Sequence, residues 1–115
     1  MATTVSNATI LGHNANATVD NGVALGSNSL ANVDYGVAGY DPSTKAASTD
    51  TSATWKSTLG AVSVGVLGSD GTATATRQIT GVAAGVKDTD AVNVAQLMAV
   101  AGNSSGGSSV QFFPS

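Results

Sequence analysis

The residues that could perform catalysis are few, and their spacing does not assemble a catalytic group. Nucleophilic hydrolysis needs a nucleophile, a base and an orienting group close together, yet His13 is the single histidine and the chain has no cysteine. His13 also occupies a repeated position that holds Ser27 in the following copy, which is typical of a surface turn residue. We therefore predict that the protein is not an enzyme.

Carboxylates are the remaining groups with chemical potential. The possible acid–base pairs are Asp34 with Asp41 and Asp88 with Asp90, and the possible calcium ligands are Asp20, Asp34 and Asp70. All of these positions also fit turns or a helix N-terminus, where a carboxylate accepts backbone N–H groups. Because no ligand-dense calcium loop is visible, we predict no metal and no cofactor.

A 14-residue repeat organises the first forty residues. Residues 8–21 (ATILGHNANATVDN) align with residues 22–35 (GVALGSNSLANVDY), so that Gly12 falls on Gly26 and Leu11 on Leu25. A third copy begins at Gly36 and fails at Gly39-Tyr40. Fourteen residues are too few for a helical hairpin but fit one coil of a β-solenoid, with two short strands and two tight turns.

The kind of apolar residue decides how such a chain could form a core. Leu, Ile, Val and Phe together number 24 of 115 residues, Ala alone supplies 19, and aromatics are 4%. Burying Ala gains little, because stabilisation scales with apolar area at roughly 25 cal/mol per Å². Disorder is disfavoured by a net charge of −3 and 10% charged residues. We therefore predict that identical copies share a core, and the four scattered Lys and Arg make nucleic-acid binding a poor hypothesis.

The middle of the chain interrupts the repeat. Residues 39–57 are rich in Ser, Thr and Ala and are predicted to form an inserted loop, which Trp55 would anchor to the body. Residues 61–68 and 72–79 both alternate in polarity around Ser69-Asp70-Gly71, a strong hairpin signal.

A joint follows at residues 77–97 (RQITGVAAGVKDTDAVNVAQL). Gly81 and Gly85 permit bends, Asp88 or Thr89 is the expected N-cap, and Asp90 would lie in the first helical turn. Residues 91–101 are expected to be helical, with Val94, Leu97 and Ala101 beginning a coiled-coil seam. The final residues, 102–115, have the composition of a flexible linker.

These motifs resemble one family. Residues 77–97 are similar to the neck of trimeric autotransporter adhesins, whose pattern runs Arg-x-Ile, Val-Ala-Gly, Thr-Asp-Ala-Val-Asn and Gln-Leu. The segments ATILGHNANA and GVALGSNSLA resemble YadA-like head repeats, and WKSTLGAVSVG resembles the insert between head and neck. The resemblance implies a mainly β fold: a trimeric left-handed parallel β-roll (solenoid) head with a hairpin insert, ending in a neck and a short coiled-coil helix.

The resulting division is residues 1–40 for the head repeats, 41–76 for the insert with its hairpin, 77–101 for the neck and the start of the stalk, and 102–115 for the flexible tail. The residues expected to form the neck and the trimer are Arg77, Ile79, Val82, Asp90, Val92, Asn93, Val94 and Leu97. The expected adhesive surface, in a run that resembles the head motif of collagen-binding members, comprises Asn21, Gly22, Val23, Ala24, Leu25, Gly26 and Ser29.

The function implied by this resemblance is attachment of a bacterium to its host. The expected partners are two further copies of the chain and a collagen-like matrix protein or a cell-surface receptor. Display at the bacterial surface from the outer membrane is implied, without membrane contact by this segment. The alternative is a purely structural spacer in a trimeric surface or phage fibre.

Overall fold

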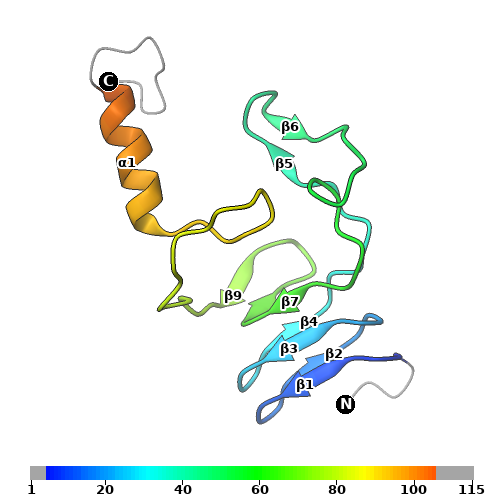
Figure 1. The fold of residues 1–115 in the computed structure, drawn as a ribbon. Helices are drawn as coiled ribbons and strands as arrows, with labels where there is room; N and C mark the ends of the chain where they lie inside the picture. The colour runs from blue at the N-terminus through cyan, green and yellow to red at the C-terminus, as the bar shows by residue number, and fades with distance from the viewer. Residues whose placement is uncertain (1–4, 106–115) are drawn as a thin grey trace. The chain divides into compact units, whose positions relative to one another are not determined.

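The computed structural model describes residues 5–105, which form nine short strands and one helix (Figure 1). They fall into two compact units that divide between Gln78 and Ile79. The strands are β1 (Thr9–Leu11), β2 (Asn16–Ala17), β3 (Val23–Leu25), β4 (Leu30–Ala31), β5 (Tyr40–Asp41), β6 (Ala46–Ala47), β7 (Val62–Ser63), β8 (Val66–Leu67) and β9 (Ala73–Ala75). The helix is α1 (Val94–Ser105), and within residues 5–105 no helix is long and apolar enough to cross a membrane.

The 14-residue repeat is also the register of strand pairing. β1 pairs in parallel with β3, with Thr9 opposite Val23, and β2 pairs in parallel with β4, with Asn16 opposite Leu30. The backbone N–H of Asn16 donates to the carbonyl of Ser29 at 2.9 Å, which ties one repeat to the next. Successive repeats therefore stack, and equivalent residues lie side by side.

Asparagines form the corners of these stacked repeats. Asn7, Asn14, Asn21 and Asn28 have φ values of 61°, 60°, 59° and 66°, so a left-handed corner recurs every seven residues. Asparagine tolerates this conformation better than other residues with a side chain, because its amide bonds locally to the backbone. Two such corners in each repeat separate the strand on one side from the strand on the other.

The third strand on this sheet comes from much later in the chain. β7 pairs in parallel with β3, with Val62 opposite Val23, and the sheet order is β1-β3-β7. The single strand predicted over residues 61–68 is therefore wrong. It divides into β7 and β8 because Gly65 turns the chain, and the carbonyl of Gly65 accepts the N–H of Leu30 at 2.8 Å.

The predicted hairpin is present in shorter form. β8 and β9 pair antiparallel, with Val66 opposite Ala75. The turn is closed by the N–H of Gly68, which donates to the carbonyl of Thr72 at 2.9 Å. Gly71 has φ +85°, a conformation that the Asp-Gly pair supplies readily.

The segment predicted as a loop contains a second ribbon. β5 and β6 pair antiparallel, and Ala38 forms an antiparallel bridge with Lys56. Trp55 is half-buried, and its carbonyl accepts the N–H of Gly39 at 2.7 Å. The interruption between β4 and β7 is thus an ordered excursion (cyan to green in Figure 1) rather than an irregular loop.

The core of the described chain is unusually small. Ala17, Ala24 and Ala31 are fully buried, and Ser29 is 1% exposed. Burying three methyl groups cannot by itself offset the conformational entropy that the ordered chain loses. Ile10 packs against these alanines but is only half-buried, and many of the larger apolar side chains are exposed.

Candidate functional site

The last stacked turn has carbonyl groups that a further repeat would otherwise satisfy. In the first two repeats, the N–H of Gly26 donates to the carbonyl of Leu11 at 2.7 Å, and the N–H of Asn28 donates to that of His13 at 2.8 Å. Fourteen residues later, the equivalent acceptors are the carbonyls of Leu25 and Ser27. The chain between β7 and β8 is too short to form a third such turn, so these acceptors need other donors.

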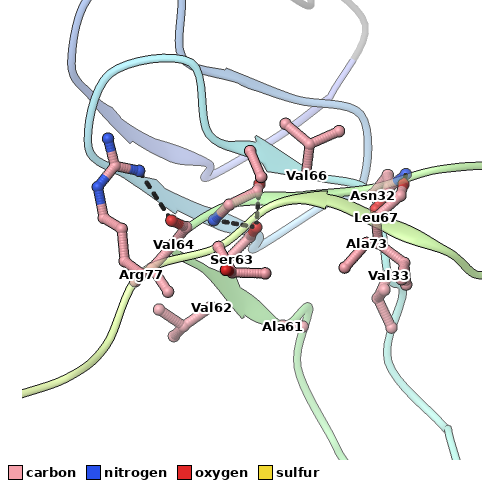
Figure 2. Close-up of a pocket in the computed structure, with 13 residues that line it drawn as sticks. Asn32, Val33, Ala61, Val62, Ser63, Val64, Val66, Leu67, Ala73 and Arg77 are labelled. Carbon is pink, nitrogen blue, oxygen red and sulfur yellow. Dashed lines mark hydrogen bonds between the residues drawn. The ribbon is translucent and has the colours of Figure 1, made fainter.

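Arg77 supplies those donors. Its Nη2 donates to the carbonyl of Ser27 at 2.8 Å. Its Nη1 donates to the carbonyl of Val64 at 2.8 Å (Figure 2). The guanidinium lies so close to Gly26 that an added Cβ there would stand 2.9 Å from Cζ. The planar, five-donor guanidinium thus occupies the space of a missing backbone turn.

Ser29 completes this arrangement. Its hydroxyl donates to the carbonyl of Leu25 at 2.9 Å and accepts a hydrogen bond from Nη1 of Arg77 at 3.1 Å. Fourteen residues earlier the same position holds Ala15, whose repeat is covered by the next one and needs no such donor. The sequence analysis treated Ser29 as adhesive surface and missed Ser27 and Val64. The departure from Ala to Ser between aligned copies was the available signal.

A continuous apolar surface lies on the outer face of the β1-β3-β7 sheet. Leu11 and Leu25 are register partners and are 65% and 42% exposed, and Val62, opposite Val23, is 64% exposed. An open groove of about 330 Å³ adjoins this face, lined by β7, β8, β9 and the Arg77 side chain (Figure 2). Exposed apolar surface of this extent is typical of a surface that another protein covers.

The structure divides the predicted adhesive residues into two groups. Gly22, Ala24 and Ser29 are buried, so these residues form part of the interior of the stack. Val23 and Gly26 are half-buried, and Asn21 and Leu25 are exposed. Contact with a partner through this run would therefore involve chiefly Asn21 and Leu25.

In the second unit, side-chain amides hold the joint to the helix. Asn93 caps α1: its Oδ1 accepts the N–H of Gln96 at 3.1 Å, while Oε1 of Gln96 accepts the N–H of Asn93 at 3.2 Å. This reciprocal pair is a capping box. Gln96 also pairs with both backbone groups of Gly85, and Nδ2 of Asn93 donates to the carbonyl of Val82 at 3.1 Å. Gln96 was predicted only as part of the neck motif and not in this capping role, although its spacing from Asn93 was the signal.

The predicted helix start is wrong by several residues. The N-cap is Asn93 rather than Asp88 or Thr89, and α1 begins at Val94 and continues to Ser105 rather than ending at 101. The remainder of the predicted flexible tail, residues 106–115, lies outside the described residues.

Asp90 therefore has a different role from the one predicted. Its Oδ2 accepts the N–H groups of Val86 at 3.0 Å and Lys87 at 3.1 Å. These bonds favour the ionised form and lower the pKa of Asp90 below its ordinary 3.8. The stability this turn gains is present above the ordinary value and is lost as the pH falls through the lowered one.

Apolar side chains from this joint also face outward within their own unit. Ile79, Val92, Val94 and Leu97 are 71%, 72%, 73% and 55% exposed. Val94 and Leu97 follow the predicted seam spacing on α1, so the helix has an apolar stripe that no other part of the described unit covers.

Four of the aspartates considered as catalytic or calcium-binding groups accept hydrogen bonds from the chain, three of them within a turn and Asp20 between successive repeats. Asp34 accepts the N–H of Tyr35 at 2.7 Å, Asp70 that of Thr72 at 3.0 Å, and Asp20 that of Ser6 at 2.8 Å. Asp41 accepts both the N–H and the hydroxyl of Ser43, which lowers its pKa. His13 is an exposed residue in the turn between β1 and β2.

Comparison with known proteins connects this geometry with one family. Residues 78–111 match the family described as the coiled stalk of trimeric autotransporter adhesins. The chain is 59% identical over 64 residues to the autotransporter adhesin BadA of Bartonella henselae, which covers 56% of this chain and 2% of that protein. It also resembles the C-terminal YadA-like domain of a Burkholderia pseudomallei protein, with 28% identity and a TM-score of 0.60 over 86% of this chain and 44% of the other.

The Arg77 contacts predict a specific loss on substitution. Arg77→Lys keeps the charge but cannot reach the Ser27 and Val64 carbonyls and the Ser29 hydroxyl together. We expect the free energy of unfolding, measured by urea denaturation, to fall by about 1–2 kcal/mol. Lys87→Arg, which also exchanges one cation for the other, is the control and should change it little. An unchanged denaturation midpoint for Arg77→Lys would contradict the assigned role.

The capping box predicts which residue starts the helix. Asn93→Ala should lower helical circular dichroism at 222 nm and cost about 1 kcal/mol in thermal unfolding, because the Gln96 N–H loses its acceptor. Thr89→Ala, at one of the two N-cap positions predicted from the sequence, should have a much smaller effect. Equal losses in the two variants would be incompatible with Asn93 as the N-cap.

Proposed function

We propose, from the similarity of the chain to trimeric autotransporter adhesins, that it forms part of a homotrimeric head, displayed from the bacterial outer membrane, that attaches to host matrix or cells. The proposal concerns a segment, since the chain spans 2% of the length of BadA. The observation that carries it is the contrast between a core of three alanines and an uncovered apolar outer face.

Three copies would supply the missing core. If the outer face of each β1-β3-β7 sheet packs toward the other two chains, Leu11, Leu25 and Val62 become interior residues. Each such side chain would gain roughly 1.5–3 kcal/mol on full burial. The proposed arrangement is the left-handed parallel β-roll that the family resemblance implies, and the groove beside β7 would receive part of a neighbouring chain.

The second unit would join this head to a stalk. The apolar stripe of Val94 and Leu97 on α1 fits the interface of a parallel coiled coil, in which such side chains pack between helices. The capping box fixes where that helix begins. The joint would thus carry each chain from a wide β structure into a narrow helical one.

Adhesion would then depend on the repeats. In a trimer that covers Leu25, Asn21 is the exposed member of the predicted adhesive run, and it would appear three times around the assembly. Three weak contacts with a repetitive ligand, such as a collagen-like protein, combine through effective concentration into useful avidity.

A structural spacer is the second candidate, and one observation favours it. Gly22, Ala24 and Ser29, within the predicted adhesive run, are buried. The residues that make this run recognisable are thus partly those that the stack needs to fold. In that case another part of the full protein would contact the host.

The shared core predicts the mass of the particle in solution. Light scattering on a size-exclusion column should give about 33 kDa, three times the 11.1 kDa chain, at every dilution. Leu11→Asp with Leu25→Asp should shift the mass toward one chain, because burying unpaired carboxylates is costly. Tyr40→Asp, in β5 and 65% exposed, is the control and should stay trimeric. A folded wild-type monomer would refute the shared core.

Binding to immobilised collagen distinguishes the adhesive head from the spacer. Asn21→Gly removes the side chain while glycine accepts the same φ. We expect apparent affinity to fall about tenfold, equivalent to 1.4 kcal/mol, whereas Asn28→Gly at the other corner should bind as the wild type does. A trimer that does not bind collagen and other matrix proteins would favour the spacer.

A further inference from the structure

Two segments of the chain have a local sequence that could pair with the edge of β3. Gly36-Val37-Ala38 repeats Gly22-Val23-Ala24 at the same 14-residue offset that relates β1 to β3. The structure nevertheless pairs β3 with Val62–Ser63. We propose that the two segments compete for this edge and that residues at the corners of the nearer copy decide the outcome, which sets the length of the repeat stack.

Two tyrosines exclude the nearer copy at corners that need positive φ. Tyr35 falls on Asn21, whose φ is 59°, and Tyr40 falls on Gly26, whose φ is 107°. An aromatic residue at the first corner is strained, and the second conformation is accessible essentially to glycine. In the structure, the left-handed conformation moves instead to Gly36, with φ +82°, and the chain leaves the stack there.

Further along the nearer copy, a proline and a lysine also prevent it from stacking on β3 and β4. Pro42 falls on Asn28, whose φ is 66° and whose N–H donates to the carbonyl of His13. Proline has φ fixed near −65° and has no N–H, so it can provide neither feature. Lys45 falls on Ala31, which is fully buried, where an ammonium group would lose its hydration.

Val62–Ser63 pairs with β3 although the entropy of loop closure favours the nearer segment. Pairing positions 23 and 62 closes 39 residues, whereas pairing 23 and 37 would close 14, which favours the nearer copy about fivefold. Gly60 packs so closely on the earlier repeat that an added Cβ would lie 2.6 Å from the carbonyl oxygen of Asp20. Further bonds join Ala61 to Val33 and Leu30 to Gly65.

The nearer copy pairs with another part of the chain instead of with β3. Its backbone pairs with the returning chain: Ala38 bridges Lys56, and the N–H of Gly39 donates to the carbonyl of Trp55. We therefore infer that residues 36–39 pair with Trp55 and Lys56 because they do not pair with β3. Trp55, the single tryptophan, reports on this ribbon directly.

Restoring the corner residues of the nearer copy should make that copy pair with β3 in place of β7. The variant Tyr35→Asn, Tyr40→Gly, Pro42→Asn and Lys45→Ala gives the four blocked positions the residues that stand fourteen positions earlier. In NMR spectra of the full chain, cross-strand NOEs from Val23 to Val37 should replace those to Val62, and Trp55 emission should shift to longer wavelength. The matched control changes the same four residues to Ala, which does not favour positive φ, and should keep the Val23–Val62 NOEs.

A second measurement keeps loss of folding from obscuring the result. Gly60→Ala should increase the unfolded fraction at a fixed denaturant concentration by at least about tenfold in the wild type, because β7 is crowded against Asp20. In the restored variant it should have little effect, since β7 no longer occupies that edge. Retention of the Val23–Val62 NOEs, an unfolded restored variant, or equal Gly60→Ala losses in both backgrounds would each overturn the proposal.

Discussion

Backbone hydrogen bonding at the end of the repeat stack is the constraint on which the first unit depends. Parallel repeats satisfy one another, but the last one leaves carbonyls that must find donors away from a sheet. The guanidinium of Arg77 and the hydroxyl of Ser29 together supply donors to Leu25, Ser27 and Val64. Because a side chain can end the stack in this way, the chain can leave a β structure and begin a different one directly afterwards.

The same stack explains why the chain would associate. Tight stacking requires small residues inside, and the interior is accordingly formed by Ala17, Ala24 and Ala31. The larger apolar residues are then left for the outer face, where Leu11 and Leu25 lie side by side. The small interior and the apolar outer face thus both follow from tight stacking. In a trimer, burial of the outer face would add the apolar stabilisation that the alanine interior lacks.

The two units use polar side chains in place of backbone at the points where regular structure stops. Arg77 takes the place of a turn, and Gln96 pairs with both backbone groups of Gly85 as a neighbouring strand would. Asn93 does the same for the first turn of α1. Substitution at such positions is expected to be destabilising, since each side chain forms hydrogen bonds with several backbone groups at once.

The sequence alone determined the 14-residue register, the Asp-Gly hairpin and the resemblance to one family, because the period, turn chemistry and motif are local properties of the chain. Tertiary structure decided which segment pairs with β3, since Val37 and Val62 are both suitable strand residues and the contacts that hold Val62 there, at Gly60 and Gly65, are with distant parts of the chain. It also decided that Ser29 is interior and that Arg77 ends the stack. Burial and long-range donors depend on where fifty residues of intervening chain return, which no local pattern encodes.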